Sequence, residues 1–455
     1  MSTTSGPITL DDHPQNDAAV LEVHGGTPLR GEVGLPGAKN AALPLIVAAC
    51  LSEEPSVLDN VPLGLNDVRV LIRLLRACGA RVDEVGGDRL ECAAGDWRDT
   101  DLRGDQAASR LRHSLLLLGA AAASGTRLAL PLPGGCQLGD RRHDLHLYAL
   151  NTMGFDLREA VNELGLAPGR PGPETSLDFR YPTFGGTLNV LFAAATWPGT
   201  TTRLRNAARN PEVEEVIRLL NSMGAKVTRP TPGDLVIRGV PRLHGVRHVV
   251  MPDRIVAATL IAATAITGGH TRLEGASLEV LESECATWRR AGISLRDDGG
   301  AIEVGAAARL RATDVVTRAY PGFHTDIQPL HAAMMCLSDG ISEVRETILD
   351  GRFAYARGLA ALGADVEVRD GGFTCVNGAA GQVLRVRGVS RLRGNEARMP
   401  DIRGGGALVV AALAAEGTTR LTNLYQLERG YRGLPDMLTA LGARVARLDP
   451  AALPA

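Results

Sequence analysis

The chain has 455 residues, of which 45% are hydrophobic and 22% are charged, and its formal net charge is −2. This length exceeds one typical hydrophobic core and predicts two domains of about 200 residues each. The near-neutral charge argues against a general nucleic-acid binder, and an aromatic content of 4% argues against a base-stacking surface. No uninterrupted apolar run is long enough to span a membrane, so we expect neither nucleic acid nor membrane as a partner.

The N-terminus and the cysteines indicate a cytoplasmic protein. Residues 1–16 are polar and lack the basic and apolar regions of a secretory signal, and we expect residues 1–18 to be a disordered tail. The seven cysteines are odd in number and form no CxxC pair. That usage is typical of a reducing compartment, in which most cysteines are buried as small apolar residues.

One pattern recurs along the chain: an apolar helix, a glycine step and a charged strand. The glycines are spaced by about seventy residues, longer than common solenoid repeats, so each unit must be a small subdomain. Alanine-rich helices are predicted at residues 40–51, 187–197 and 405–415, and an amphipathic helix at 212–223. Six copies of a mixed α-β-α-β-β unit give three per domain. The six glycines are Gly79, Gly154, Gly224, Gly292, Gly363 and Gly442.

A loop at residues 131–146 concentrates reactive side chains. Cys136 follows two glycines, where the backbone bends freely, and arginines and histidines follow within ten residues. Cationic neighbours favour a thiolate, so the loop can hold an anion and offer a nucleophilic or acidic thiol. The alternative is a surface turn with solvated charges. Neither His143 with His146 nor His324 with His331 completes a metal-ligand set, so no metal site is predicted.

Several motifs in order resemble the enolpyruvyl transferases. They are GAKNAALP at 37–44, the Gly-Gly-Cys loop, FHTD at 323–326, DIR at 401–403 and ERGY at 428–431. The resemblance runs from about residue 21 to residue 447. It implies an α/β fold, a two-domain inside-out α/β barrel with six repeats of a βαβαββ-type unit, three per domain.

The family pattern also implies domain boundaries, because the chain is expected to cross between domains twice. One domain would comprise residues 1–38 plus 252–455. The other would comprise residues 39–251 and carry the Cys136 loop. Closure of the two domains would assemble the site and exclude water from a reactive enol ether.

The implied reaction transfers the enolpyruvyl group of phosphoenolpyruvate to a hydroxyl group and releases phosphate. Phosphoenolpyruvate carries a phosphate and a carboxylate, and arginine binds both anions bidentately, so no cofactor is needed. By the family motifs, Lys39, Arg141 and Arg429 would hold the phosphate. Arg352 and Arg403 would hold the carboxylate.

Three residues match catalytic positions of the family. Cys136 would act as the acid and form a covalent adduct, Asp326 would act as the base, and Lys39 would assist at the phosphate. Several of the site assignments have a structural alternative: Lys39 with Asn40 a polar helix start, Asp326 the N-cap of a helix from Ile327, and Arg403 a charge in a cap region.

The acceptor is expected to be a uridine nucleotide. The resemblance departs here, since the usual SVGAT reads TFGGT at residues 183–187, and histidine replaces a more usual proline or glutamine at 324. One expected acceptor is UDP-N-acetylglucosamine, for the synthesis of peptidoglycan precursors. The other is a smaller uridine nucleotide such as UMP, which would react at its 3'-hydroxyl in nucleoside-antibiotic assembly. The expected nucleotide-binding residues are Asn40, Arg112, Asp144, Thr183, Phe184 and Gly185.

Two other functions remain open at this stage. A synthase acting on shikimate 3-phosphate belongs to the same class, but that branch lacks the loop cysteine that Cys136 matches. A non-catalytic paralogue that binds a nucleotide and regulates a partner is disfavoured, because a dead enzyme has little reason to keep an acid, a base and five anion ligands. The sequence predicts no oligomeric state.

Overall fold

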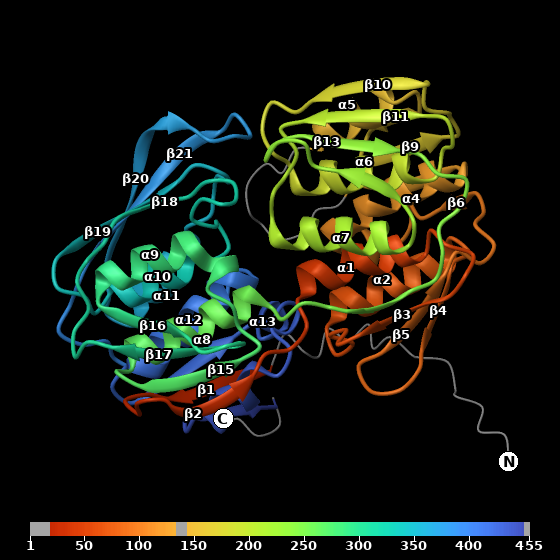
Figure 1. Ribbon diagram of the computed structural model, residues 1–455. Helices are drawn as coiled ribbons and strands as arrows, with labels where there is room; N and C mark the ends of the chain where they lie inside the picture. Colours follow the sequence, from red (N-terminus) through yellow and green to blue (C-terminus); the bar gives the residue numbers. More distant parts are fainter. Residues whose placement is uncertain (1–18, 133–142, 450–455) are drawn as a thin grey trace, which may run out of the picture.

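The computed structural model of the chain describes residues 19–132 and 143–449, and the predicted N-terminal tail lies outside this part (Figure 1). Its buried hydrophobic side chains form two separate clusters. One runs from residue 38 to residue 250, and we name this part the central lobe. The other combines residues 19–29 with residues 255–443, and we name it the terminal lobe. The chain therefore crosses between the lobes twice.

The central lobe contains three four-stranded sheets. In sheet order the first consists of β14 (Arg247–Val249), β3 (Ser56–Asp59), β5 (Leu90–Ala93) and β4 (Arg81–Glu84). The second consists of β6 (Thr100–Asp101), β7 (Leu128–Pro131), β9 (Glu163–Ala167) and β8 (Asp156–Ala160). The third consists of β10 (Glu174–Asp178), β11 (Thr201–Arg205), β13 (Leu235–Arg238) and β12 (Lys226–Thr228).

The terminal lobe also contains three four-stranded sheets. The first, in sheet order, consists of β2 (Arg30–Gly34), β15 (His270–Glu274), β17 (Ala301–Ala306) and β16 (Ile293–Asp297). The next consists of β18 (Val315–Val316), β19 (Ile341–Glu346), β21 (Ala380–Arg387) and β20 (Asp365–Thr374). The last consists of β22 (Glu396–Arg398), β23 (Thr418–Thr422), β1 (Val20–His24) and β24 (Arg444–Leu448).

All six of these sheets share one pairing pattern. The first strand pairs parallel with the second, the second antiparallel with the third, and the third antiparallel with the fourth. A parallel neighbour requires a crossover connection, which a helix supplies in most sheets. In Figure 1 the sheets lie on the outside of each lobe and most of the helices lie between them.

The helices differ in how much of their surface is buried. In α1, α8 and α12 nearly every residue is buried, because these helices are apolar on all sides and pack inside their lobes. Those of the central lobe are α1 (Lys39–Ala49), α2 (Asn66–Ala77), α3 (Gln106–Arg110), the 3-10 helix η2 (Arg112–Leu115), α4 (Leu116–Ser124), α5 (Asp144–Thr152), α6 (Phe184–Ala195) and α7 (Pro211–Ser222). Those of the terminal lobe are α8 (Arg254–Ile266), η3 (Glu279–Leu281), α9 (Glu282–Ala291), α10 (Gln328–Met335), α11 (Ala356–Ala361), α12 (Ile402–Ala414), α13 (Tyr425–Glu428) and α14 (Leu434–Ala440).

The six glycines of the sequence pattern all lie where a helix turns into a strand. Each has a positive φ, from 88° for Gly363 to 101° for Gly79 and Gly292. An L side chain is disfavoured in this left-handed conformation, so glycine ends these helices without strain. The predicted helices begin one to three residues earlier in the structure: 40–51 corresponds to α1, 187–197 to α6, 405–415 to α12 and 212–223 to α7.

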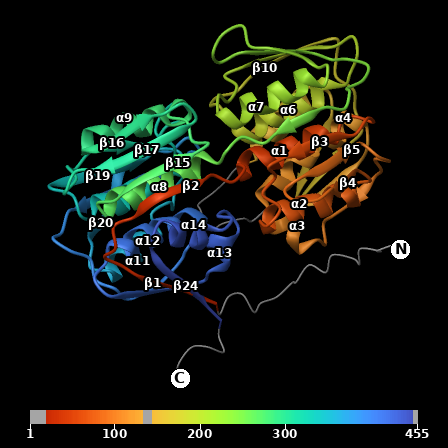
Figure 2. The same ribbon diagram turned by 60° about the horizontal axis from the view of Figure 1, so that its bottom comes forward.

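The two ends of the described chain meet in one sheet. Strand β1 pairs antiparallel with β23 on one side and with β24 on the other, as Figure 2 shows for β1 and β24. Because β2 also joins β15, the N-terminal segment adds a strand to two sheets of the terminal lobe. Within the described residues, no helix combines the length and the apolar character needed to cross a membrane.

Candidate active site

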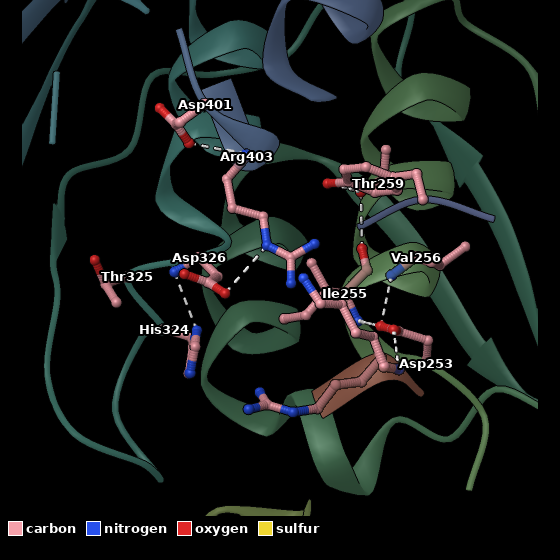
Figure 3. Close-up of polar contacts among 12 residues, drawn as sticks. Asp253, Ile255, Val256, Thr259, His324, Thr325, Asp326, Asp401 and Arg403 are labelled. Carbon is pink, nitrogen blue, oxygen red and sulfur yellow. Dashed lines mark hydrogen bonds and ion pairs between the residues drawn. The ribbon is translucent and has the colours of Figure 1, made fainter. Parts of the chain in front are cut away.

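A carboxylate and two arginines form the centre of the site in the terminal lobe, and Figure 3 shows the carboxylate, Asp326, with one of the arginines, Arg403. Asp326, just before α10, accepts from Arg352 Nη2 through Oδ1 at 2.8 Å and from Arg403 Nε through Oδ2 at 3.1 Å. Arg352 follows β19 and is 1% exposed, and Arg403 is the second residue of α12. Arg352 and Arg403, which were expected to bind the carboxylate of the substrate, therefore lie together and both contact the carboxylate of Asp326.

The first turn of α12 supports this centre. Asp401 is the N-cap, and its Oδ1 accepts from the backbone N–H groups of Arg403 at 2.9 Å and Gly404 at 3.1 Å. These N–H groups have no partner within the helix, so the cap satisfies them. The same oxygen lies 3.3 Å from Arg352 Nη1. Asp401 thus orients both arginines, one through its backbone and one through its side chain.

The alternative role considered for Asp326 is wrong. Helix α10 begins at Gln328, one residue later than expected, and its N-cap is Ile327, with no side-chain cap bond. The carboxylate of Asp326 does not cap the helix because it is bound by Arg352 and Arg403. Its position is therefore set by charge and not by helix capping.

Lys39 and Arg429 meet on a second buried carboxylate, Asp67. Lys39 Nζ lies 2.5 Å from Asp67 Oδ2, and Arg429 Nε lies 3.2 Å from Oδ1. Lys39 begins α1, and its backbone N–H donates to Asp253 Oδ2 at 3.1 Å, while Asp67 belongs to the first turn of α2. The N-terminal ends of α1, α2 and α8 and the residue after α13 therefore meet here. We name Lys39, Asp67 and Arg429 the ion cluster.

The ion cluster carries a net positive charge, from two cations against one carboxylate. Burial lowers the pKa of Lys39; Asp67 opposes this effect, and Arg429 and Arg403 add to it. Burial alone would raise the pKa of Asp67, but Lys39 and Arg429 outweigh it and the pKa is lowered. Arg403, which binds Asp326, is thus among the charges that lower the pKa of Lys39.

Contacts from Arg429 and Arg254 join the two lobes around this site. Arg429 Nη2, in the terminal lobe, donates to the carbonyl of Arg110 in the central lobe at 3.2 Å. Arg254, the first residue of α8, pairs with Glu212 of α7 at 2.8 Å, and both side chains are buried. A buried pair loses hydration on both partners, so it is held by geometry as much as by attraction.

Three of the expected nucleotide residues, Thr183, Phe184 and Gly185, lie together at the N-terminus of α6 in the central lobe, whereas the other three belong to α1, η2 and α5. Thr183 caps this helix, its Oγ1 accepting from the N–H of Gly186 at 3.5 Å, and the Phe184 ring packs edge-on against His113 with centroids 6.4 Å apart. A Cβ on Gly185 would come within 2.8 Å of the His146 ring. Glycine is therefore required here by the close approach of a ring.

His146 is a buried histidine of α5 that carries no assigned role in the sequence pattern. Its Nδ1 lies 2.8 Å from Asn189 Nδ2, whose other partner is the carbonyl of Leu115 at 2.9 Å. Burial, with Arg112 and His143 nearby, lowers the pKa of His146 to about 3. The ring is therefore neutral at physiological pH and accepts at Nδ1.

Asp144 is the first residue of α5, the helix that also carries His146. One oxygen, Oδ2, pairs with Arg180 at 2.5 Å. The other, Oδ1, is buried and has no hydrogen-bond partner among the described residues. Arg112 begins η2 and Asn40 is the second residue of α1, and both are half-buried. An unsatisfied carboxylate oxygen is a natural acceptor for an imide N–H.

Cys136 and Arg141 lie at residues 133–142, outside the described residues, so their expected roles stay predictions. The described chain ends at Leu132 after β7 and resumes at His143 before α5. The loop is therefore attached at one end to the helix that carries Asp144. The described cysteines, all buried as expected, are Cys50, Cys78, Cys92, Cys285, Cys336 and Cys375.

Sequence reasoning missed three buried polar residues of the site, Asp67, His146 and Asn189. Each belongs to a helix whose pattern explains its apolar neighbours, but burial of a polar side chain is not visible in the pattern itself. The signal that could have found such a residue is a polar side chain within an otherwise apolar helix, as with Asn189 in α6. Within the described residues, no group of three or more His, Cys, Asp or Glu is placed to hold a metal ion.

Comparison with known proteins identifies the family. The model of the EPSP synthase family (3-phosphoshikimate 1-carboxyvinyltransferase) matches residues 23–438. The chain belongs to the EPSP synthase family. This membership shows an α/β fold of two domains, in agreement with the two separate hydrophobic clusters.

Individual members of the EPSP synthase family resemble the chain over nearly its whole length. UDP-N-acetylglucosamine 1-carboxyvinyltransferase 1 of Symbiobacterium thermophilum is 38% identical over 97% of this chain and 99% of the relative. The UDP-N-acetylglucosamine 1-carboxyvinyltransferase of Solidesulfovibrio magneticus is 39% identical over 94% of this chain and 99% of the relative. The crystal structure of the enolpyruvyl transferase NikO from Streptomyces tendae superimposes with a TM-score of 0.82 at 27% identity, covering 94% of this chain and 98% of NikO.

Proposed function

We propose that this chain transfers the enolpyruvyl group of phosphoenolpyruvate to a hydroxyl of UDP-N-acetylglucosamine and releases phosphate. The observation that carries the proposal is the pair of carboxylate-bound cation groups, Lys39 with Arg429 and Arg352 with Arg403. A substrate with one phosphate and one carboxylate matches two such groups. The identity of 38–39% to UDP-N-acetylglucosamine 1-carboxyvinyltransferases supports the acceptor and a place in peptidoglycan precursor synthesis.

The proposed reaction has two steps. In the first, Cys136 protonates the methylene carbon of phosphoenolpyruvate, and the acceptor oxygen adds to C2 as Asp326 removes its proton. In the second, the C2–O bond to phosphate breaks and the methyl carbon returns a proton to the Cys136 thiolate, while the proton on Asp326 leaves with the phosphate. The products are an enol ether and free phosphate. Lys39 and Arg429, with Arg141, would neutralise the departing phosphate, and no cofactor enters either step.

The uridine part of the acceptor has support at the central lobe. Asp144 Oδ1, which has no hydrogen-bond partner among the described residues, would accept the imide N–H of uracil, and Thr183, Phe184 and Gly185 at the start of α6 would contact the same nucleotide. Asn40 and Arg112 complete this proposed nucleotide group. Peptidoglycan precursor synthesis would place the protein in the cytoplasm.

The domain division belongs to the same proposal. We assign residues 39–251 to one domain and residues 1–38 plus 252–455 to the other, as the two hydrophobic clusters suggest. In each domain three sheets with one common pairing pattern would form an inside-out α/β barrel of three repeats. The site residues would then come from both domains, so that domain movement brings the cation groups onto one substrate.

A second acceptor, the 3'-hydroxyl of UMP, is favoured by one local feature. Phe184 packs on His113 at the start of α6, where the sequence departs from the family pattern, and a bulky ring there reduces the space beyond the uridine. The structural likeness to NikO, with a TM-score of 0.82, shows that the fold also carries other enolpyruvyl transferases.

The deciding experiment measures phosphate release from phosphoenolpyruvate with UDP-N-acetylglucosamine and UMP in parallel, with shikimate 3-phosphate as a third acceptor. The proposal expects the highest kcat/KM with UDP-N-acetylglucosamine. Preference for UMP would move the protein to specialised nucleotide metabolism. Release with shikimate 3-phosphate alone, or with none of the three, would overturn the proposal.

A further inference from the structure

Residues 323 and 324, which precede Asp326 in the chain, are held in place by contacts of their own. Phe323 is buried, with its ring edge-on to Trp288 at 6.4 Å and to His331 at 5.7 Å between centroids. The backbone N–H of His324 donates to Glu284 Oε1 at 2.7 Å. Two residues before Asp326 are thus fixed by a packed ring and by a buried carboxylate of α9.

The side chain of His324 turns back onto the backbone of Asp326. The N–H of Asp326 donates to His324 Nδ1 at 3.0 Å, as the dashed line in Figure 3 shows. A ring nitrogen that accepts carries no proton, so the neutral ring of His324 holds its proton on Nε2. The N–H of Asp326 lies just ahead of α10, where the first N–H groups of a helix have no partner within it.

The charges around His324 come from several elements and keep the ring neutral. Burial and Arg254 of α8 lower its pKa to about 4, against the opposing effect of Asp326 and of Glu212 in α7, while Arg403 of α12 lowers it further. Glu284 of α9 faces its backbone. Above about pH 4, Nδ1 therefore remains an acceptor.

We infer that His324 is a positioning residue for Asp326. Its Nδ1 holds the backbone N–H of Asp326, so that the carboxylate is directed at Arg352 and Arg403 and at the acceptor hydroxyl. This role rests on the proposed function, in which Asp326 is the base. His324 acts through Asp326, because its Nδ1 is occupied by the N–H of Asp326 and takes no part in proton transfer.

Other contacts hold the neighbouring residue Thr325 and the carboxylate of Asp326, which Arg352 and Arg403 bind, whereas His324 holds the backbone N–H of Asp326. Thr325 Oγ1 donates to Glu346 Oε2 at 2.8 Å, and the Thr325 carbonyl accepts from Arg352 Nε at 3.4 Å. With the acceptor at residue 324 removed, the N–H of Asp326 loses this bond, and we expect the backbone that carries the carboxylate to be held less firmly. Misplacement of a reacting group by about 1 Å can cost on the order of 100-fold in rate.

The test is a matched pair of substitutions. In His324→Asn, Oδ1 occupies nearly the place of Nδ1 and keeps the acceptor, whereas in His324→Gln the amide lies one bond further out, near the place of Nε2. We expect His324→Asn to keep kcat within about 3-fold of the wild type and His324→Gln to lose about 10- to 100-fold, with the KM for phosphoenolpyruvate changed less than about 3-fold.

Thermal unfolding of both variants checks that they fold, and nitrogen-15 NMR of histidine-labelled wild type checks that Nδ1 of His324 is unprotonated at pH 7. Equal kcat for the Asn and Gln variants in an active enzyme overturns the positioning role, as does a proton on Nδ1. A loss confined to KM also overturns it. No turnover by the wild type with any of the three acceptors instead overturns the proposed function, and the positioning role with it.

Discussion

At the residue scale, each cation group of the described site is held by a carboxylate of the protein. Asp67 binds Lys39 and Arg429, and Asp326 binds Arg352 and Arg403. Like charges packed in a buried space repel one another, so the carboxylates stabilise the cations where a substrate anion is needed. Removal of one partner of a buried pair leaves an uncompensated charge and commonly costs about 3–5 kcal/mol.

Asp67→Asn tests this arrangement through the protonation of Lys39. Asp67 raises the pKa of Lys39 against burial, so the variant should lose the Lys39 proton at a lower pH. We expect kcat/KM for phosphoenolpyruvate to fall about 10- to 100-fold at pH 8 and its alkaline limb to move to lower pH. The pH profile of kcat/KM is the measurement.

Asp59→Asn is the control for that variant. It removes a carboxylate bound to Arg247 at 2.7 Å on the central lobe, outside the site. Its pH profile should match the wild type. An alkaline limb unchanged in Asp67→Asn would show that Asp67 does not control the charge of Lys39.

Thiol modification provides a second prediction at this scale. The six described cysteines are buried, and burial raises the pKa of Cys78 and Cys375 to about 11 and that of Cys285 and Cys336 to about 12. A thiolate is the reactive form, so an alkylator at pH 7.5 should label the native protein once, at Cys136. Peptide mapping by mass spectrometry identifies the site.

Cys136→Asp is the matched variant for the labelling experiment. It should remain unlabelled and resist inactivation by the alkylator. Full sensitivity of Cys136→Asp would show that another residue is the target.

At the element scale, two interior helices begin at aspartates that serve both the helix and the site. Asp401 caps α12 and contacts Arg352, and Asp253 caps α8 while its Oδ2 accepts the backbone N–H of Lys39. Figure 3 draws both aspartates in one view with Asp326 and Arg403. A shift of either helix start would therefore move a contact of Arg352 or of Lys39.

Asp401→Ala and Asp401→Asn separate the capping role from the charge. Alanine loses the cap and the partner of Arg352, and we expect about 3–5 kcal/mol lower free energy of unfolding. Asparagine retains an acceptor for Arg403 N–H and Gly404 N–H, so about 1–2 kcal/mol is expected. Urea unfolding at pH 7 measures both.

The exposed pair of Asp365 with Arg387 offers a control for these two variants. Both side chains are 58% exposed, so Asp365→Ala should change stability by less than about 0.5 kcal/mol. Equal losses for Asp401→Ala and Asp401→Asn would mean that the cap bonds contribute nothing measurable.

Local chemistry explains which parts of the fold could be predicted from the sequence. The glycine steps were predictable because a positive φ selects glycine, and Gly79 and Gly292 show that conformation. The interior helices were predictable from continuous apolar runs. Their first residues were not, because the start of α12 depends on the Asp401 cap and not on the apolar run.

The candidate site could be predicted only in part. Motif order placed Lys39, Arg352, Arg403 and Asp326 in one site, but not the carboxylate that each cation contacts. Arg429 and Asp67, for example, are 362 residues apart in sequence. No local pattern encodes such a pair, since it depends on how the two lobes meet.

At the scale of the whole molecule, buried histidines make stability depend on pH. Burial lowers the pKa of His146 to about 3 and those of His324 and His331 to about 4. An unfolded histidine titrates near pH 6.5, so the unfolded chain binds more protons between about pH 4 and 6.5. This stabilisation is complete above pH 6.5 and is lost as the pH falls toward 4.

We expect each of these histidines to contribute about 1.4 kcal/mol per pH unit to the slope of unfolding free energy near pH 5. Urea unfolding between pH 7 and pH 5 measures the slope. His331→Gln should reduce it by about that amount, whatever the variant costs at pH 7. An unchanged slope would show that His331 titrates in the folded protein as it does when unfolded.

The sheet that contains β1, β23 and β24 limits the order in which parts of the fold can form during synthesis. Glu22 of β1 and Arg420 of β23 are 398 residues apart, yet they form an ion pair across one ladder. Among the described residues, every strand of the central lobe lies between residues 56 and 249, so this lobe can fold while the ribosome is still translating the terminal lobe. Strand β2 must wait for β15 at residues 270–274, and β1 for β23 at residues 418–422, so a nascent chain halted before β23 would expose β1 as an unpaired edge.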